Sequence, residues 1–341
     1  MLPASAEAME AAARERMSAV AYAFYASGSF AEVSVVRNVA AWSSWYLRPR
    51  IGVNVTSIDT STHVLGSRID LPVLLAPCGF NRLAHPDGEI GVARAAARAG
   101  TIQVLSSASS QEPQDVSAST KAPKWFQLYA DNDPAVTDER VARAEAAGFS
   151  ALVITVDTPA LGIRYQGLAD LKAFLDELGG LGVVPPISSF CEHLDWSELE
   201  RIASRTSLPV VLKGVLHPED AARAPECGAR AIIVSNHGGR QLDGSIPPAL
   251  ALPEIVAAAG ERIEVYVDGG VRTGVDVLRA LALGARAVLI GRPYLWALAI
   301  GGWEGVAELL ERFQVELRNA MALAGQTAAN SIDPSIVVRR T

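Results

Sequence analysis

Eight short apolar runs, separated by helical patterns, constrain the fold of this chain more than any other feature. Their apolar residues are continuous rather than alternating, as a parallel strand buried on both faces requires. The runs span residues 72–77, 102–106, 125–129, 151–157, 209–214, 231–236, 264–269 and 287–291. We therefore expect eight buried parallel strands.

Helical patterns lie between several of these runs. They cover residues 88–100, 138–148, 218–228 and 274–284, and each ends on a glycine, a common C-terminal signal of a helix. Strand–helix alternation repeated eight times predicts an α/β fold of the (β/α)₈ TIM-barrel type. An open, doubly wound sheet is the alternative.

Two further segments lie outside this alternation. Residues 1–70 precede the first predicted strand, and we expect them to form an N-terminal helical and capping segment. Residues 158–208 form an excursion between the fourth and fifth strands, with a predicted helix over 195–205. We expect residues 1–341 to form a single domain. Long loops of this kind are usually functional, so the excursion is expected to be near the active site.

Charge and cysteine content exclude several classes of protein. The net charge of −7 gives no basic field for nucleic acid or anionic lipid. The three cysteines, Cys78, Cys191 and Cys227, are odd in number and lack CxxC spacing, which disfavours a disulfide framework or a zinc site and predicts no metal. Without a signal-peptide pattern or a run of 18 apolar residues, we expect a cytoplasmic protein with no membrane span.

Polar residues gather where the predicted strands end, and in a TIM barrel the chemistry lies at these C-terminal ends. They are Ser106, Gln127, Tyr129, Thr155, Asp157, Lys213, Ser235, His237, Asp268 and Arg292. A random polar rim is the alternative. Lys213 argues against it, because a lysine at that depth must pair with a charge or serve a cofactor.

The last two strands carry the signals of a phosphate site. VDGGVRTG (267–274) opens a helix after the seventh strand, and GRP (291–293) follows the eighth. Glycines let main-chain amides approach an anion, and Arg272 and Arg292 supply bidentate donors. Because loops after strands seven and eight recurrently bind phosphate in this fold, we expect a phosphate-bearing ligand.

The stretch SNHGGRQLDG (235–244) places His237 and Arg240 beside a glycine pair. It is either an ordinary polar loop or the source of a proton acceptor and an anion clamp. Together with LVITVDTPALGIR, VVLKG, VDGGVRTGVDVLRALALGARAVLIGRP and APCGFNRLAHPDGE, it resembles the FMN-dependent 2-hydroxy acid oxidase/dehydrogenase family, which includes glycolate oxidase, lactate oxidase and mandelate dehydrogenase. No GxGxxG follows a first strand, which disfavours a nicotinamide enzyme of the Rossmann type.

The resemblance implies roles for named residues. His237 would be the catalytic base, Asp157 would orient and charge it, and Lys213 would stabilise the reduced flavin. The implied substrate-binding residues are Phe24, Tyr129, Arg164 and Arg240. The implied FMN contacts are Ala76, Pro77, Cys78, Ser106, Gln127, Thr155, Lys213, Ser235, Gly238, Asp268, Gly269, Gly270, Arg272, Gly291 and Arg292. The implied partners are a 2-hydroxy acid, dioxygen or a quinone-type acceptor, and further copies of the chain in a homotetramer.

Three positions differ from the family pattern, and all three changes suit a larger substrate. Phe24 stands where most of the family has tyrosine, Gly79 where glycolate enzymes have alanine, and Ala108 where glycolate oxidase has tryptophan. We interpret these changes as favouring a bulky, mandelate-like L-2-hydroxy acid; neutral packing drift is the alternative. The excursion after Arg164 also reads as shortened. Two other functions stay open: oxidation of an amine or natural-product intermediate, and a catalytically silent flavin-binding protein.

Overall fold

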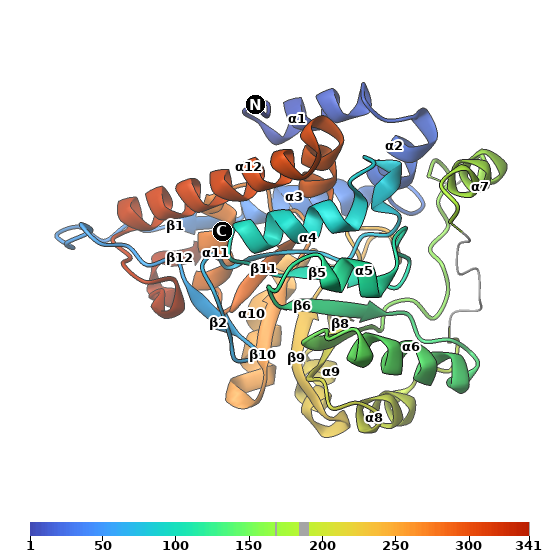
Figure 1. Cartoon of the computed structure of the whole chain (residues 1–341). Helices are drawn as coiled ribbons and strands as arrows, with labels where there is room; N and C mark the ends of the chain where they lie inside the picture. The colour runs from blue at the N-terminus through green and yellow to red at the C-terminus, as the bar shows by residue number, and fades with distance from the viewer. Residues whose placement is uncertain (168, 184–190, 341) are drawn as a thin grey trace.

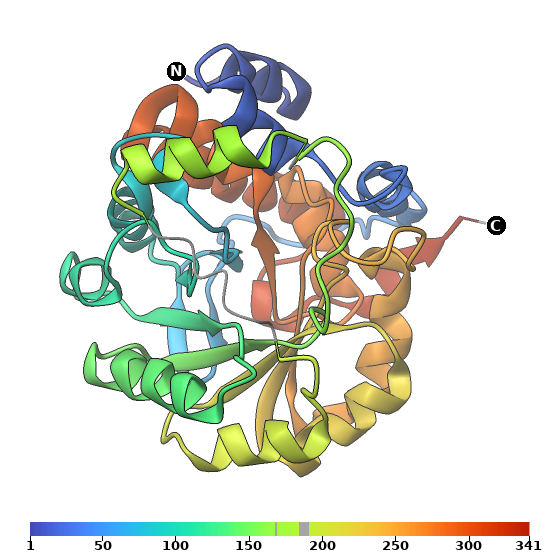
Figure 2. The same ribbon diagram turned by 90° about the vertical axis from the view of Figure 1, so that its right-hand side faces the viewer.

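A closed barrel of eight parallel strands forms the centre of the molecule. The computed structural model describes residues 1–167, 169–183 and 191–340. Seen along its axis, the barrel is surrounded by helices (Figure 2). The strands, in barrel order, are β4 (Val73–Leu75), β5 (Gln103–Ser106), β6 (Lys124–Leu128), β7 (Ala151–Thr155), β8 (Val210–Val215), β9 (Ala229–Val234), β10 (Glu264–Val267) and β11 (Ala287–Ile290). The predicted TIM barrel is therefore confirmed.

Six of the eight strands end one or two residues before the predicted runs do. β6 stops before Tyr129, and β7 stops at Thr155, two residues before Asp157. The predicted strand ends were taken from the apolar residues, whereas the hydrogen-bond ladder between strands stops where the chain turns into each loop. Tyr129 and Asp157 thus lie on loops at the strand ends rather than within strands, which is where the barrel places its chemistry.

A two-stranded hairpin closes the end of the barrel where the strands begin. It consists of β2 (Thr62–Val64) and β3 (Ser67–Ile69). Val64 and Ile69 pack against side chains from the barrel interior, among them Trp125 and Tyr266. The Leu65 amide at the hairpin tip donates to the carboxylate of Glu264, the first residue of β10. The ligand-accessible end is therefore the opposite one.

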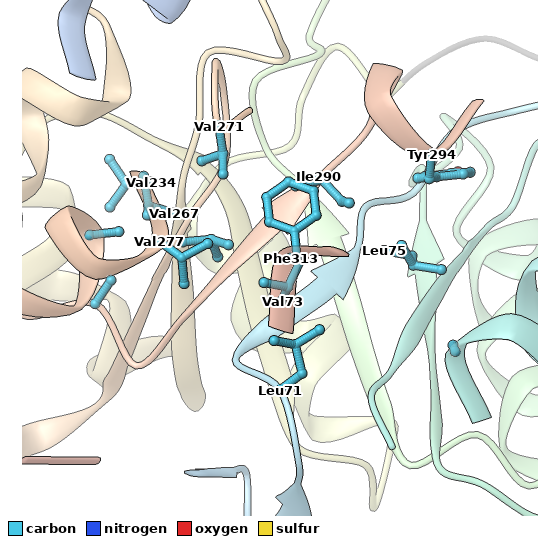
Figure 3. Packing of buried hydrophobic residues seen from close by; sticks show 14 of the residues in the cluster. Leu71, Val73, Leu75, Val234, Val267, Val271, Val277, Ile290, Tyr294 and Phe313 are labelled. Atoms are coloured by element: carbon cyan, nitrogen blue, oxygen red, sulfur yellow. The ribbon is translucent and has the colours of Figure 1, made fainter. Parts of the chain in front are cut away.

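Most of the apolar core lies between the strands and the outer helices. Figure 3 shows part of it, where Val73 and Ile290 from neighbouring strands lie near Phe313 from a helix. The principal helices are α4 (Gly88–Arg98), α5 (Pro113–Ala118), α6 (Pro134–Ala146), α8 (Trp196–Ser204), α9 (Pro218–Arg223), α10 (Pro248–Ala259), α11 (Gly274–Ala282) and α12 (Arg292–Ala324). Helix α12 is interrupted at Gly301 and Gly302, whose backbone is not helical. The 294–303 segment is mostly buried core.

The four predicted glycine stops are confirmed. Gly100, Gly148, Gly228 and Gly284 all adopt positive φ, which glycine tolerates better than other residues. The predicted helix over 218–228 is only partly right, since α9 ends at Arg223 and a 3₁₀ turn, η2 (Ala224–Cys227), completes it. Pro225 explains the break, because proline cannot supply the amide that a continuing α-helix needs.

The N-terminal segment forms helices α1 (Ala6–Arg14), α2 (Ala19–Ala26) and α3 (Val33–Trp42), followed by β1 (Trp45–Leu47). Strand β1 pairs with the C-terminal strand β12 (Val337–Arg339), which joins the two ends of the chain (Figure 1). The excursion also contains helix α7 (Leu171–Gly180), which was not predicted from the sequence. Within the described residues, no helix combines the length and apolarity needed to cross a membrane.

Candidate active site

A cavity of about 600 Å³ lies at the strand ends opposite the hairpin. Side chains predicted from the sequence contribute much of its lining: Phe24, Ala76, Pro77, Cys78, Ser106, Tyr129, Arg164, Lys213, His237, Gly238, Arg240, Asp268, Gly269, Gly270, Arg272, Gly291 and Arg292. Four predicted residues do not line it: Gln127, Asp157, Thr155 and Ser235. Asp157, Ser235 and Gln127 hydrogen-bond to lining residues, and Thr155 hydrogen-bonds to Gln127, so the structure brings the predicted set together as one connected group.

His237 and Asp157 form a half-buried pair at this cavity. The imidazole Nδ1 lies 3.0 Å from Asp157 Oδ1, and Nε2 lies 3.4 Å from the Tyr129 hydroxyl. Burial is the largest influence on His237 and lowers its pKa below the usual value, although Asp157 opposes that effect. Burial alone would raise the pKa of Asp157, but His237 and Lys213 outweigh it and lower the pKa. The arrangement holds a neutral imidazole against a carboxylate, which suits proton acceptance.

Two residues that the sequence analysis did not single out hold this pair in place. Gly214, with φ +112°, lies against Asp157, and a Cβ there would be 2.6 Å from the Asp157 Cβ. The amide of Gln241 donates to the carbonyls of Asp157 and Ala160 at 2.7 and 2.8 Å. Both residues fall inside motifs quoted above, VVLKG and SNHGGRQLDG, but their roles depend on a contact between distant loops.

The turn that carries His237 has an unusual backbone. His237, Gly238 and Gly239 all have positive φ, of 58°, 65° and 77°. For a histidine this conformation is uncommon and costs roughly 1–3 kcal/mol. The Ser235 hydroxyl accepts from the His237 amide at 3.0 Å and so supports the turn. Gly239 has no room for a side chain, because a Cβ would lie 2.8 Å from the Val35 amide nitrogen.

Lys213 is part of a buried polar network. Its Nζ lies 3.2 Å from Asp268 Oδ2 and donates to Ser235 Oγ at 3.0 Å. Burial alone would lower the pKa of Lys213, but the carboxylates of Asp268 and Asp157 outweigh burial and raise it. Lys213 therefore stays charged at the cavity wall. On the neighbouring strands, Gln127 bridges the hydroxyls of Ser106 and Thr155 with two 3.0 Å hydrogen bonds.

Two arginines converge on the carbonyl end of helix α2. Arg240 Nη1 donates to the carbonyls of Phe24, Tyr25 and Ser27 at 2.7, 3.3 and 3.1 Å. Arg292 donates to the carbonyls of Tyr25, Ser27 and Gly238 at 3.0, 3.1 and 2.9 Å. Cations are favourable at a helix C-terminus, where carbonyls lack intrahelical partners. Both side chains thus fix α2 and its Phe24 over the cavity, a role that the motifs alone did not indicate.

The cavity carries a large surplus of positive charge. Six cationic side chains line it, Arg140, Arg164, Lys213, Arg240, Arg272 and Arg292, against one carboxylate, Asp268. Burial and the neighbouring Arg292 lower the pKa of Arg272 to about 10. The Nε of Arg164 is buried with no hydrogen-bond partner among the described residues. Lys213 pairs with Asp268 and Arg140 pairs with Asp131, so a chain of net charge −7 still has an excess of positive charge in this cavity, which fits anionic ligands.

Comparison with known proteins decides the family. A family model described as FMN-dependent dehydrogenase matches residues 13–179 and 183–339. The chain belongs to this family. It is 44% identical to the L-lactate oxidase of a Nostoc species, with 96% of each chain covered, and 42% identical to glycolate oxidase 1 of Oryza sativa subsp. indica, covering 95% of this chain and 92% of the relative. A crystal structure of mandelate oxidase with 3,3-difluoro-2-hydroxy-3-phenylpropionic acid superimposes with a TM-score of 0.88 at 41% identity and covers 99% of each chain.

This enzyme therefore carries out FMN-dependent oxidation of 2-hydroxy acids. Its cavity fits the cofactor. Arg272 and Arg292 lie at the cavity wall, where they would supply positive charge for the FMN phosphate. Gly269 and Gly270 line the cavity with main chain, and a Cβ on Gly270 would overlap the Asn38 carbonyl oxygen, so this glycine is needed for packing against helix α3. Among the described residues, no group of three or more His, Cys, Asp or Glu side chains could hold a metal ion.

Proposed function

We propose that this enzyme oxidises the L enantiomer of a 2-hydroxy acid with a bulky or aromatic side chain to the corresponding 2-oxo acid. One observation supports it most. His237, paired with Asp157 at 3.0 Å, lines the same cavity as Arg164, a half-buried cation whose buried Nε has no hydrogen-bond partner among the described residues. A proton acceptor and an anion site facing one cavity suit a small acid that loses a proton next to its carboxylate.

The proposed roles follow from the geometry. Arg164, with Arg240, binds the substrate carboxylate and sets the orientation of C2. His237 takes a proton from the hydroxyl or the α-carbon, and Asp157 stabilises the resulting imidazolium. The Tyr129 hydroxyl, 3.4 Å from His237 Nε2, lies where it would hydrogen-bond the substrate next to the base.

FMN is held by the residues that line the cavity from Ala76 to Arg292, and when bound it supplies an isoalloxazine ring that accepts two electrons from the substrate. Lys213 places a fixed positive charge at the cavity wall, where it would offset negative charge that develops on reduction. Because Lys213 is already paired with Asp268, its charge needs no reorganisation during the reaction.

The size of the substrate is inferred from the apolar part of the cavity. Phe24, Gly79 and Ala108 all line it. Gly79 itself has little spare room, since a Cβ there would lie 3.3 Å from the Ala108 Cβ. The small pair leaves room for a substrate side chain, and Phe24 offers it an aromatic face.

An anaerobic titration tests the proposal. The holoenzyme would be mixed with glycolate, L-lactate and each enantiomer of mandelate, and flavin reduction followed by the loss of visible absorbance. We expect L-mandelate to bleach the flavin most efficiently. The His237→Asn variant should still bind FMN, but no 2-hydroxy acid should reduce its flavin. Admission of air then separates reoxidation by dioxygen from reoxidation by a quinone. If no hydroxy acid bleaches the wild-type flavin, the proposal is wrong; if glycolate is fastest, the inference on substrate size is wrong.

A further inference from the structure

Helix α7 contributes a wall to the substrate end of the cavity that no strand-end motif supplies. Its apolar residues, Leu171, Phe174, Leu175 and Leu178, recur at helical spacing and make the helix amphipathic. Phe174 is 5% exposed and Leu178 is fully buried. Leu171, Phe174 and Leu175 line the cavity together with Arg164 and His237, whereas Leu178 does not.

The helix is fastened to the rest of the molecule by polar contacts at its C-terminal half. Ser18 Oγ, the N-cap of α2, donates to Glu177 Oε2 at 2.9 Å. Arg82 Nη1, in the 3₁₀ turn η1 (Asn81–Leu83), donates to the Leu181 carbonyl at 3.0 Å. Figure 2 shows α7 lying beside the N-terminal helices. The wall is therefore positioned by specific contacts to two other parts of the fold.

Phe174 completes a cluster of three aromatic rings from three separate elements. Its ring stacks on Phe24 with a centroid distance of 4.7 Å and an interplanar angle of 28°. Phe80 lies 6.0 Å from each of the other two rings. All three rings line the cavity, and Ala108 packs against the same cluster. Phe24 and Ala108, two of the three positions interpreted above as favouring a bulky substrate, thus converge on one aromatic surface.

We propose that Phe174 is a specificity-determining residue that selects 2-hydroxy acids with an aromatic substituent on C2 over small aliphatic ones; this inference rests on the proposed function. An aromatic substituent gains ring contacts in the cluster, and aromatic pairs contribute beyond their buried area. The methyl group of lactate is too small to contact the same aromatic surface. Selection by Phe174 would act through the substrate side chain and leave the chemistry at C2 to His237.

The test compares two alanine variants of the same helix in the FMN-loaded enzyme. Phe174→Ala removes a ring that lines the cavity, and Leu178→Ala removes a fully buried side chain that does not. Because both changes weaken the packing of α7, the second is the control for a purely structural effect. We expect Phe174→Ala to lower the ratio of kcat/KM for L-mandelate over L-lactate by about tenfold or more, and Leu178→Ala to leave that ratio within about twofold.

A binding measurement makes the result independent of turnover. Phenylacetate and acetate carry the carboxylate but no hydroxyl, and their binding can be followed by perturbation of the flavin spectrum. Phe174→Ala should weaken the binding of phenylacetate by about tenfold and leave the binding of acetate unchanged. Equal losses for both ligands, or equal effects in Phe174→Ala and Leu178→Ala, would overturn the inference. If wild type oxidises 2-hydroxy acids but Phe174→Ala leaves the ratio unchanged, only this inference fails. If the wild-type enzyme oxidises no 2-hydroxy acid, the proposed function fails, and the binding data alone still test the role of Phe174.

Discussion

Replacement of Asp157 by asparagine tests most directly whether the His237–Asp157 pair does the proposed chemistry. Asparagine has nearly the same shape and keeps an oxygen that can accept from His237 Nδ1, so the imidazole retains its position. What disappears is the negative charge 3.0 Å from the ring. We expect the variant to bind FMN and substrate normally and to reduce its flavin slowly, because the imidazolium formed on proton transfer is no longer stabilised.

The size of the effect follows from the geometry. A hydrogen bond to a charged group contributes about 1.5–3 kcal/mol, which corresponds to a loss of about 10- to 150-fold in rate. Coulomb's law at 3.0 Å with an effective dielectric constant of about 20 gives about 5.5 kcal/mol as an upper limit, or about 10⁴-fold. The nearby Lys213 reduces the benefit, because it already attracts the same carboxylate. We therefore expect a loss nearer 100-fold.

Stopped-flow measurement of flavin reduction under anaerobic conditions gives the rate without the oxidative half-reaction. Thermal unfolding provides the control. His237 and Lys213 hold the pKa of Asp157 below its usual value in the folded protein, so the charge stabilises the fold and its removal should lower the melting temperature slightly. A rate within threefold of wild type, with FMN fully bound, would refute the proposed role of Asp157. A large fall in melting temperature would show that the carboxylate is mainly structural.

Two further perturbations test the same site. The base acts when neutral, so flavin reduction should be lost as pH falls through the His237 pKa; since burial lowers that pKa, we expect a midpoint below about 6.5 in a plot of reduction rate against pH, and a midpoint above 7 contradicts it. Gly214→Ala should displace Asp157, because the added Cβ would lie 2.6 Å from the Asp157 Cβ, and should slow flavin reduction while destabilising the fold by about 1–3 kcal/mol. Gly148→Ala, also at positive φ but with nothing within 4 Å, is its matched control: it should lower the melting temperature without slowing reduction.

Much of the barrel could be predicted because its signals are local. A buried parallel strand must be apolar along its whole length, so β7 and β9 were visible as continuous runs. The strand ends then identified Lys213 and His237 as neighbours in space, although 24 residues separate them in the chain. The closed barrel turns sequence positions at strand ends into one rim, and this rule needs no knowledge of side-chain packing.

The contacts that hold the rim in place could not be predicted in the same way. Arg240 looked like part of an anion clamp, yet its Nη1 is shared by three carbonyls at the end of α2. Gly214 looked like a strand residue, yet its lack of a side chain makes room for Asp157. Each of these contacts joins segments that are distant in the chain, and no local pattern encodes which carbonyl or side chain will be opposite.

The two proposals assign chemistry and specificity to different parts of the fold. Lys213 lies in β8, and Asp157 and His237 follow β7 and β9, whose positions are set by the hydrogen-bond ladder of the barrel. Phe174 is on α7, which is attached through a few contacts such as Ser18 with Glu177 and Arg82 with the Leu181 carbonyl. A change in α7 can thus alter which side chain fits while the base and its carboxylate stay in place. Such a separation is consistent with the similar identity, 44%, 42% and 41%, of this chain to relatives named for lactate, glycolate and mandelate oxidation.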